Sequence, residues 1–510
     1  MKKRIFRNRR SRYAAVSATL TILVIAAVIL ANSVFGSLAS RYEWHSYMTA
    51  EANYDVTSVC YSLLDKKLSA TYADKRTGDI RILFCDTEEA WKADATQSYL
   101  YHTAKSIGDR YDGISVEFHD IKLNPDSVRP YTKDPVTGET VIFESSGVVI
   151  VCDDYYRFYA LEEFFAFSDR ASGTVWGYSG ERTLAAGILR ALNRNPQTAC
   201  LTSNHGEIFY DYELIYLLDA AGYKLNTSFD LAVDDIPDDC TLIISSNPNS
   251  DLDFTDGINE DKKLDAFLEK DGRSLIVLLA NSTPKLSNYE SYLQSWGVRT
   301  LYFNDPTSGK SYRYTVQDTG NSLTSDGYTI TGELSGDAFA QKEFAGLNES
   351  VIFKNATALT NATDFVASQN GTYVKGNRTL HAIYETADTA SLWANGVARS
   401  GDNAMLMTLT EQRNQTGGSS YVSVISSVEF AEQGMLQTAV YSNPDTLQRL
   451  FRVMGQDYTT EGLRLKPFAS TEISTITTAQ MFRWTACLAV IPACAIAAIA
   501  VFVLVRRRRA

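Results

Sequence analysis

Two uncharged segments, one near each end of the 510-residue chain, limit what it can fold into more than any other feature. Residues 14–35 read AAVSATLTILVIAAVILANSVF, and residues 484–505 read WTACLAVIPACAIAAIAVFVLV. At about 1.5 Å rise per residue, each run is long enough to cross a hydrocarbon layer of about 30 Å as a helix. We therefore predict transmembrane helices at 14–36 and 484–505.

Basic residues lie on the outer side of both segments. Residues 1–13 contain seven Lys and Arg and no acidic residue, and residues 506–510 contain four Arg. Flanking Lys and Arg resist translocation, so we expect both ends to be cytoplasmic and the large middle segment to lie outside the cell membrane. A cleaved signal peptide is the alternative for the first segment, because Ser37-Leu38-Ala39 offers small residues for cleavage. Its uncharged run, however, exceeds the core of about 7–15 residues in a signal sequence.

The segment between the two runs is acidic. Of the 48 Lys and Arg residues, 11 lie in the basic ends, so 37 basic residues face 60 acidic ones in the rest of the chain. Binding to nucleic acid depends on Lys and Arg that neutralise phosphates, and binding to anionic lipid needs basic clusters. The composition therefore argues against nucleic acid as a partner.

The cysteines outside the second uncharged segment are odd in number, and most lie in or beside apolar runs. They are Cys60, Cys85, Cys152, Cys200 and Cys240. This placement predicts free, buried thiols and not a disulfide framework. The sequence has no C-x-x-C pair and its histidines are scattered, so no metal site and no cofactor is predicted.

The order of apolar runs predicts an α/β fold with Rossmann-like, mostly parallel sheets. In an N-terminal α/β domain, 37–145, a strand, a long helix and a strand imply a parallel pair with a right-handed crossover. In a Rossmann-like domain, 146–300, strands and helices alternate with short connections, as in doubly wound sheets. We predict strands at 79–85, 114–121, 147–154, 198–204, 240–247 and 273–280, and helices at 87–109, 180–194, 210–223, 260–272 and 287–298.

The remaining segments differ in character. Residues 301–400 are rich in Thr, Asn, Gly and Ser with short β-prone runs, which predicts a β-rich insertion. Residues 401–468 read as a C-terminal α/β piece, with a strand and turn at 421–432 and a helix at 443–455. A polar tether, 469–483, connects this piece to the second uncharged segment.

The stretch TSNHGE contains the candidate binding residues Asn204, His205, Gly206 and Glu207. In an open α/β sheet, ligands settle beyond the carboxyl ends of the strands, and amides that open the next helix hold anions. A plain turn explains the same residues, with Gly206 permitting a positive φ and Glu207 complementing the helix dipole. Catalysis is the third reading: His205 and Glu207 can pair as acid and base, but no third member and no G-x-S-x-G elbow is present.

Three other patterns have plain explanations. The Gly-Lys-Ser at 309–311 lacks the first Gly of a phosphate-binding loop, so we predict a surface loop and no ATPase in this chain. The acidic runs at 151–156 and 233–240 lack EF-hand spacing and are predicted to be solvated loops. The aromatic stretch at 155–167 fits either a core or an exposed face for a glycan or protein partner.

The ordered set of pieces resembles the auxiliary membrane subunits of ABC-type transport systems, the family that includes the gliding-motility protein GldG. The likeness rests on GERTLAAGILRAL, on the turn SNHGE, on LDAFLEKDGRSLIVLLANS with LQSWGV, and on VSVISSVEFAEQGM with SNPDTLQRLFRVM, between the two uncharged segments. The chain departs from the family pattern at Asn204, where a Gly is expected, and in EKDGRSL, which lacks paired glycines.

This resemblance implies a non-enzymatic subunit that partners an ABC permease and an ABC ATPase, with an extracytoplasmic domain that binds or guides a substrate or an envelope partner. Two other functions stay open from the residues alone. One is a free-standing cell-envelope binding or sensor protein for glycan or peptide. The other is a degenerate hydrolase-like domain with residual catalysis at His205.

Overall fold

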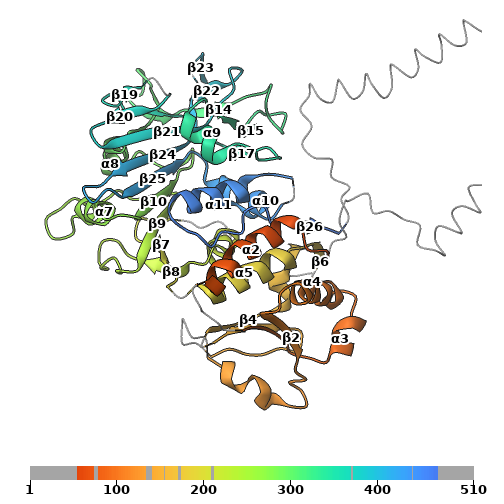
Figure 1. Cartoon of the computed structure of the whole chain (residues 1–510). Coiled ribbons are helices and arrows are strands. Elements are labelled where there is room, and N and C mark those ends of the chain that lie inside the picture. The colour runs from red at the N-terminus through yellow and green to blue at the C-terminus, as the bar shows by residue number, and fades with distance from the viewer. Residues whose placement is uncertain are drawn as a thin grey trace, which may run out of the picture. The chain divides into compact units, whose positions relative to one another are not determined.

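In the computed structural model, a small mixed sheet follows the first described helix of the chain (Figure 1). The described residues are 54–73, 79–133, 140–153, 155–169, 174–193, 195–207, 212–368, 371–401, 403–438 and 440–468. All of them belong to one compact unit, which begins at Asn53. The predicted membrane segments, 14–36 and 484–505, and the tether lie outside the described residues. Within the described ranges, no helix is both long enough and apolar enough to cross a membrane.

The small sheet has the strand order β2-β1-β3-β4. Its first two strands, β1 and β2, are parallel, with Ile80 opposite Ile114, which confirms the parallel pair expected from the strand–helix–strand order. The next strand pairs antiparallel with β1, and the fourth pairs antiparallel with the third, so the sheet is mixed. The strands are β1 (Ile80–Phe84), β2 (Ile114–Phe118), β3 (Val148–Cys152) and β4 (Tyr155–Tyr159).

The single helix predicted at 87–109 is wrong, because the structure has two helices there. The first, α3 (Glu88–Ala93), ends at Asp94, whose backbone is extended, and α4 (Gln97–Arg110) follows. The Asp94 carboxylate accepts hydrogen bonds from the amides of Thr96 and Gln97, at 2.9 and 2.8 Å. Short polar side chains that bond to nearby amides in this way compete with the helix and restart it.

Further elements cover and extend the small sheet. α4 and α2 both pack on α5, which contacts β3. A second, three-stranded sheet has the order β26-β6-β5 and joins the end of the described chain to this region. The elements are α2 (Ser58–Ala73), α5 (Gly180–Leu192), β5 (Phe165–Asp169), β6 (Thr174–Tyr178), β26 (Lys466–Pro467) and the 3₁₀ helices η1 (Pro125–Tyr131) and η2 (Leu161–Phe164).

A larger sheet contains the predicted doubly wound part. Five neighbouring strands run parallel in the order β8-β7-β9-β10-β25. Counted along the chain this order is 2-1-3-4-5, so the winding reverses between β7 and β9, which is where doubly wound sheets bind ligands. The strands are β7 (Thr198–Thr202), β8 (Lys224–Phe229), β9 (Cys240–Ser246), β10 (Ser274–Leu278) and β25 (Ser419–Ile425).

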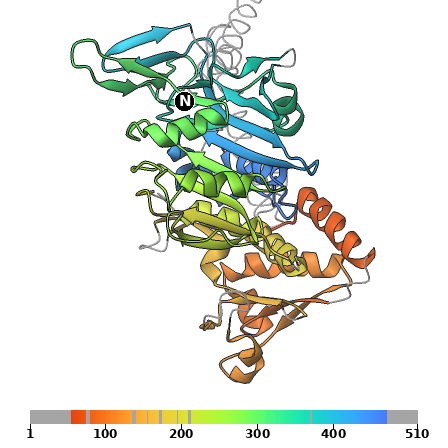
Figure 2. The ribbon, with the colours of Figure 1, turned by 90° about the vertical axis from the view of Figure 1, so that its left-hand side faces the viewer.

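Helices cover both faces of this parallel part. Leucines of α6 and α11 pack in one core with alternate strand residues such as Ala199 and Leu201. Side chains of α7 and α8 pack in a second core with the intervening residue Cys200. Figure 2 shows α7 and α8, in green, in front of the sheet. The helices are α6 (Tyr212–Ala220), α7 (Glu260–Leu268), α8 (Ser287–Ser295) and α11 (Asn443–Val453).

The β-rich stretch 301–400 and the first strand after it, β24, extend the same large sheet. β24 pairs antiparallel with β25, and β21 pairs antiparallel with β24, so the sheet continues past its parallel part (Figure 1). A mixed α/β fold with parallel and antiparallel sheets is therefore what the described residues form. The strands of this extension are β19 (Val366–Ala367), β20 (Tyr373–Lys375), β21 (Arg378–Glu385) and β24 (Met405–Arg413).

Short elements surround the extension and complete the described chain. They are β11 (Val298–Thr300), β12 (Tyr302–Asn304), β13 (Ser311–Arg313), β14 (Thr315–Gln317), β15 (Thr329–Thr331), β16 (Glu333–Leu334), β17 (Ile352–Lys354), β18 (Leu359–Asn361), β22 (Ser391–Ala394), β23 (Val397–Ser400), α9 (Ala338–Phe344), η3 (Val428–Ala431) and α10 (Gln433–Leu436). The five cysteines of the described residues are free and buried, which confirms that prediction.

Candidate functional site

The turn that contains the candidate residues lies at the reversal point of the large sheet. β7 ends at Thr202, and the turn follows directly beside the carboxyl end of β9. The backbone carbonyl of His205 accepts hydrogen bonds from the amides of Asn249 and Ser250, just after β9, at 2.8 and 2.9 Å. The sequence therefore placed these residues correctly at the carboxyl edge of the parallel strands.

His205 is buried between two carboxylates. Its side chain is 5% exposed, and those of Glu207 and Glu260 are 0% and 1% exposed. The ring atom Nε2 lies 2.9 Å from Oε2 of Glu260, and Nδ1 lies 3.3 Å from Oε1 of Glu207. Both ring nitrogens thus face a carboxylate oxygen.

Neighbouring groups satisfy the remaining oxygens of the two carboxylates. Glu207 accepts from the hydroxyls of Thr202 and Ser245, at 2.5 and 3.1 Å, and from the amide of His205. Glu260 accepts from Asn204 Nδ2 at 2.8 Å and from the amide of Asp253 at 2.6 Å. A buried polar network that is satisfied in this way fixes one arrangement of its members.

The charges of this cluster follow from its contacts. Burial lowers the pKa of His205, but hydrogen bonds to Glu207 and Glu260 outweigh burial and raise the pKa to about 9. Burial raises the pKa of both carboxyls, and the hydrogen bonds from His205 outweigh it, so both pKa values lie below the usual range. At neutral pH the site is a buried imidazolium between two carboxylates.

This geometry separates the three readings of the turn. A protonated His205 with a carboxylate on each ring nitrogen has no lone pair to accept a substrate proton, which argues against a general base. The Glu207 carboxylate points back to His205 and Thr202, so it is not placed as a cap for the next helix, which is described from Tyr212 on. Gly206 has φ +70°, which confirms that the turn uses the conformational freedom of glycine.

Glu260 belongs to this site, although no pattern in the sequence indicates it. It lies at the first position of α7, far along the chain from the turn. Its neighbour Asn259 has a left-handed backbone with φ +46°, which turns the chain into the helix. Only the winding of the sheet brings α7 beside the end of β7, and a pattern search along the chain cannot detect that.

The Gly-Lys-Ser sequence does not form a phosphate-binding loop. It lies in the antiparallel hairpin of β12 and β13, and Asn304 pairs with Ser311. The Asp305 carboxylate accepts from the amide of Thr307 at 2.8 Å and from the hydroxyl of Ser308 at 2.6 Å. A phosphate-binding loop needs a strand before it and a helix after it, so the prediction of a surface loop is confirmed.

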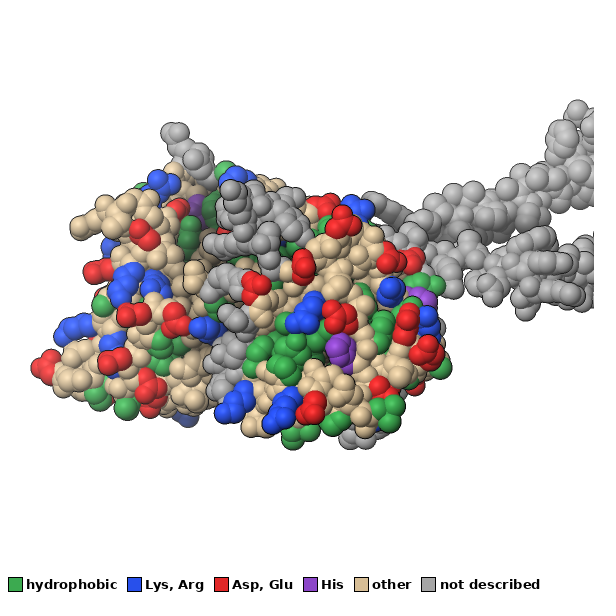
Figure 3. All heavy atoms as spheres, turned by 60° about the horizontal axis from the view of Figure 1, so that its bottom comes forward, with side chains coloured by type: hydrophobic (Ala, Val, Ile, Leu, Met, Phe, Trp, Pro, Cys, Tyr) green, Lys and Arg blue, Asp and Glu red, His purple; other side chains and the backbone are tan. Residues whose placement is uncertain are grey.

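Side chains of the aromatic stretch 155–167 pack on both faces of the small sheet. Tyr159 is buried in the inner core, whereas Tyr156 and Phe158 pack with Val149 and Val151 on the other face. Figure 3 shows hydrophobic side chains gathered on the side of the molecule that lies at the bottom of Figure 1, among charged ones. The aromatic residues are therefore part of the packing of this sheet.

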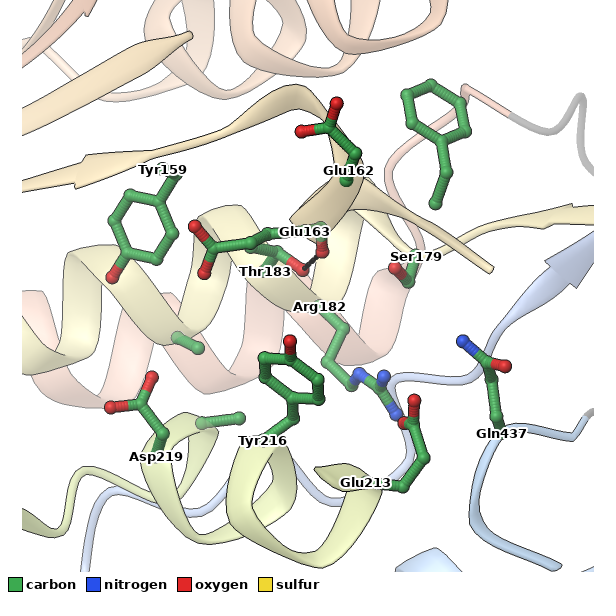
Figure 4. A pocket seen from close by; sticks show the side chains of 13 residues that line it. Tyr159, Glu162, Glu163, Ser179, Arg182, Thr183, Glu213, Tyr216, Asp219 and Gln437 are labelled. Carbon is green, nitrogen blue, oxygen red and sulfur yellow. Dashed lines mark hydrogen bonds between the residues drawn. The ribbon is translucent and has the colours of Figure 1, made fainter. Parts of the chain in front are cut away.

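A second candidate site is a pocket between α5, α6 and η2. Its open space is about 680 Å³, part of which is solvent. Figure 4 shows Ser179, Arg182, Glu213 and Gln437 around one end of the pocket. At the other end, the carboxylate of Asp219 binds Arg157 of β4 and Arg190 of α5. The remaining lining residues are Tyr159, Glu162, Glu163, Phe165, Thr183, Ala186, Tyr216 and Ala220.

Metal ligands do not gather in the part of the chain that the structure describes: no group of three or more His, Cys, Asp and Glu has the geometry to hold an ion there.

Comparisons with known proteins give little further information. No protein-family model matches the chain, and no curated protein matches it. A solved structure described as "mmIFT52 N-terminal domain" is similar over 52% of this chain and 99% of that one, at 13% sequence identity. Its TM-score of 0.33 is below the level that indicates a shared fold.

Proposed function

We propose that this chain is a membrane-anchored, non-enzymatic auxiliary subunit of an ABC-type transport system, similar to GldG. Two transmembrane helices hold an extracytoplasmic Rossmann-like domain at the cell membrane, with both ends of the chain in the cytoplasm. An ABC permease and an ABC ATPase are the partners, and the domain binds or guides a substrate or an envelope partner. The observation that best supports this proposal is the pair of uncharged segments, each with a basic outer end, on either side of an acidic α/β domain.

The cluster at the reversal point supports a role without catalysis. His205 is held as a cation by Glu207 and Glu260, so its ring is not available as a base at neutral pH. The cluster instead connects three separate parts of the chain: the end of β7, the segment after β9 and the start of α7. Such a connection keeps the edge of the sheet rigid, which suits a docking domain.

Co-purification tests the proposed partners. The full chain is solubilised in mild detergent, captured by a tag, and its companions are identified by mass spectrometry. We expect an ABC ATPase and a permease in amounts comparable to the chain itself. An unrelated protein with two membrane segments and the same tag is the control. Recovery of the chain without either partner contradicts the proposal.

Cysteine labelling tests the proposed topology. Because the five cysteines of the described residues are buried, an exposed position is needed. Ser308→Cys, in the exposed β12–β13 turn, is expected to react with a membrane-impermeant maleimide on intact cells. Ala510→Cys is expected to react only after the membrane is opened. Labelling of both positions in intact cells contradicts a cytoplasmic C-terminus.

A free-standing envelope binding protein is the second candidate function. The observation in its favour is the pocket between α5, α6 and η2, because it brings an arginine, carboxylates and aromatic rings together in one hollow. Hollows that combine apolar walls with a few polar groups are typical of sites for small ligands. This function predicts that ligand binding persists when no transport partner co-purifies.

A further inference from the structure

The two ends of the described chain meet at the first turn of α5. One end is the N-terminal stem, residues 54–57, which comes directly before α2. The other is the C-terminal stem, residues 466–468, which contains β26. Along the sequence, residues 37–53 and 469–483 connect these stems to the two uncharged segments. The contacts of the stems are therefore the last described ones before the predicted membrane helices.

One buried carboxylate holds both stems. Oε1 of Glu181, in the first turn of α5, accepts from the amide and the hydroxyl of Thr57, at 2.7 and 2.6 Å. The other oxygen, Oε2, lies 2.7 Å from Nζ of Lys466. Glu181 is 2% exposed, so its charge is stabilised by donors of the protein and not by water. Lys466 also donates to the backbone carbonyl of Asp55, which joins the two stems directly.

Backbone pairing at the stems is short. β26 is two residues long and pairs with β6. The amide of Phe468 donates to the carbonyl of Trp176 at 3.0 Å, and the carbonyl of Tyr54 accepts from the hydroxyl of Thr103 at 2.8 Å. Short terminal segments of this kind open at a low cost in free energy while the core stays folded. The contacts with Glu181 therefore decide how firmly the stems are held.

Because the stems share one carboxylate, release of one stem affects the other. When Lys466 leaves, Glu181 keeps a buried charge without its cation, which costs far more than the loss of an exposed ion pair. Water relieves this cost if it reaches the carboxylate, and movement of Thr57 away from Oε1 opens a path for it. The carbonyl of Asp55 loses its donor in the same event. Release of the C-terminal stem therefore lowers the cost of releasing the N-terminal one.

The same turn of α5 also contributes to the pocket between α5, α6 and η2. Ser179 and Arg182, which lie on either side of Glu181 in the sequence, both line that pocket, and so does Thr183 (Figure 4). The amide of Thr183 donates to the carbonyl of Ser179 at 3.0 Å, which closes this first turn. A displacement of Glu181 by the stems therefore acts on a turn that forms part of the pocket wall.

We propose that Glu181 is a latch that ties the two stems to each other and to α5, so that both stems are released together when either one is pulled away. Through this latch the two predicted membrane helices act on the domain as a pair. Displacement of one helix reaches the other stem and the first turn of α5 through the same carboxylate. The latch is a property of the chain itself and needs no ABC partner, so its absence would leave the proposed transport function open, and the reverse.

Hydrogen–deuterium exchange of the full chain in detergent, measured by mass spectrometry on peptides that cover the stems, tests the latch. Lys466→Met removes the cation of the C-terminal stem and leaves the hydrogen bond between Thr57 and Glu181 in place. We expect exchange about tenfold faster or more at the amides of both Thr57 and Phe468, because release of one stem promotes release of the other. Lys466→Arg keeps a cation beside Glu181 and is expected to restore slow exchange at both stems.

Glu181→Ala removes the latch itself and is expected to speed exchange at both stems. Glu162→Ala, at an exposed position of η2 outside the stems, is the matched control and is expected to leave both stems unchanged. Slow exchange in β9 and β10 shows that a variant is folded. If Glu181→Ala fails to fold, Lys466→Met decides. In a folded Lys466→Met variant, faster exchange at Phe468 alone, or unchanged exchange at both stems, overturns the latch.

Discussion

The ring nitrogen Nε2 of His205 lies 2.9 Å from Oε2 of Glu260, and the two side chains are 5% and 1% exposed. With Glu207 on the other ring nitrogen, the contact joins the turn after β7 to the first residue of α7. Had His205 been exposed, its removal would change folding little. Because it is buried between two carboxylates, the opposite is expected.

His205→Ala is expected to lower the free energy of unfolding by about 3–5 kcal/mol, because it leaves two carboxylates buried without their cation. Urea unfolding of the full chain in detergent, followed by tryptophan fluorescence, measures the effect. The control is His102→Ala on α4, where the side chain is exposed and a change within about 0.5 kcal/mol is expected. Equal unfolding midpoints for the two variants would show that the cluster contributes little to stability.

Stability is expected to fall on the alkaline side of neutrality. The pKa of His205 is raised to about 9 in the folded chain, against about 6.5 when it is unfolded. The contribution of the protonated ring is therefore complete below about pH 6.5 and is lost as the pH rises through about 9, by up to about 3 kcal/mol. Urea unfolding between about pH 6 and pH 10 measures it.

Glu260→Gln provides the matched variant for this pH dependence. It removes one of the two carboxylates that raise the pKa of His205, so the alkaline loss of stability is expected to be smaller and to end at lower pH. The two carboxyls act in the acid range with the opposite sign. Their pKa values are lowered on folding, so their contribution is present above about pH 4 and is lost as the pH falls further. An alkaline profile that is the same with and without Glu260 would contradict the assignment to His205.

Gly206→Ala is expected to cost about 1 kcal/mol of stability through backbone strain alone. The residue has φ +70°, a conformation that residues with a Cβ adopt reluctantly, while an added Cβ would meet only Asn249 at 3.5 Å. Gly336→Ala is the control, because an added Cβ there meets nothing within 4 Å and its φ is not positive. Thermal unfolding of both variants is compared, and the difference between them measures the strain that the positive φ at Gly206 imposes on alanine. Equal stabilities would mean that the turn relaxes to accept alanine.

Asp219→Asn is expected to destabilise the contact between α6 and the small-sheet region by about 3 kcal/mol, since Arg157 and Arg190 then lose their shared counter-ion. Asp65→Asn removes a pair with Arg110 in which both side chains are about half exposed, and an effect below about 1 kcal/mol is expected. Proteolysis of the native variants, with the cut sites mapped by mass spectrometry, shows whether the added opening lies between these parts. Equal protection of the two variants contradicts the prediction.

Local patterns predicted most of the parallel part of the fold. Runs such as 198–204, 240–247 and 273–280 contain the strands β7, β9 and β10, because strands covered on both faces are continuously apolar. The same patterns did not show the break at Asp94, where one side chain bonds to two amides and outweighs helical periodicity. They also did not show that β21 hydrogen-bonds into the large sheet, since pairing partners leave no mark on an isolated run.

The candidate sites divide in the same way. The turn around His205 was visible because a strand ends there in small and polar residues. Glu260 and Arg182 were not recognised as site residues. Each lies on an amphipathic helix, where a charged residue is expected to belong to the solvent-exposed face. Their significance comes from what packs against those helices.

The strand β25 has parallel pairing on one side, with β10, and antiparallel pairing on the other, with β24. The parallel partner, β10, is synthesised long before β25, and all of residues 301–400 are synthesised between these two strands. Contacts between such distant parts of a chain form slowly, because a large loop must close first. The small sheet β2-β1-β3-β4 has all its strands within the first part of the chain and can form early, whereas β10 keeps an open hydrogen-bonding edge until β25 arrives. During synthesis, the edge of β10 is therefore exposed for a long interval, and a chaperone that covers strand edges would bind the nascent chain at this stage.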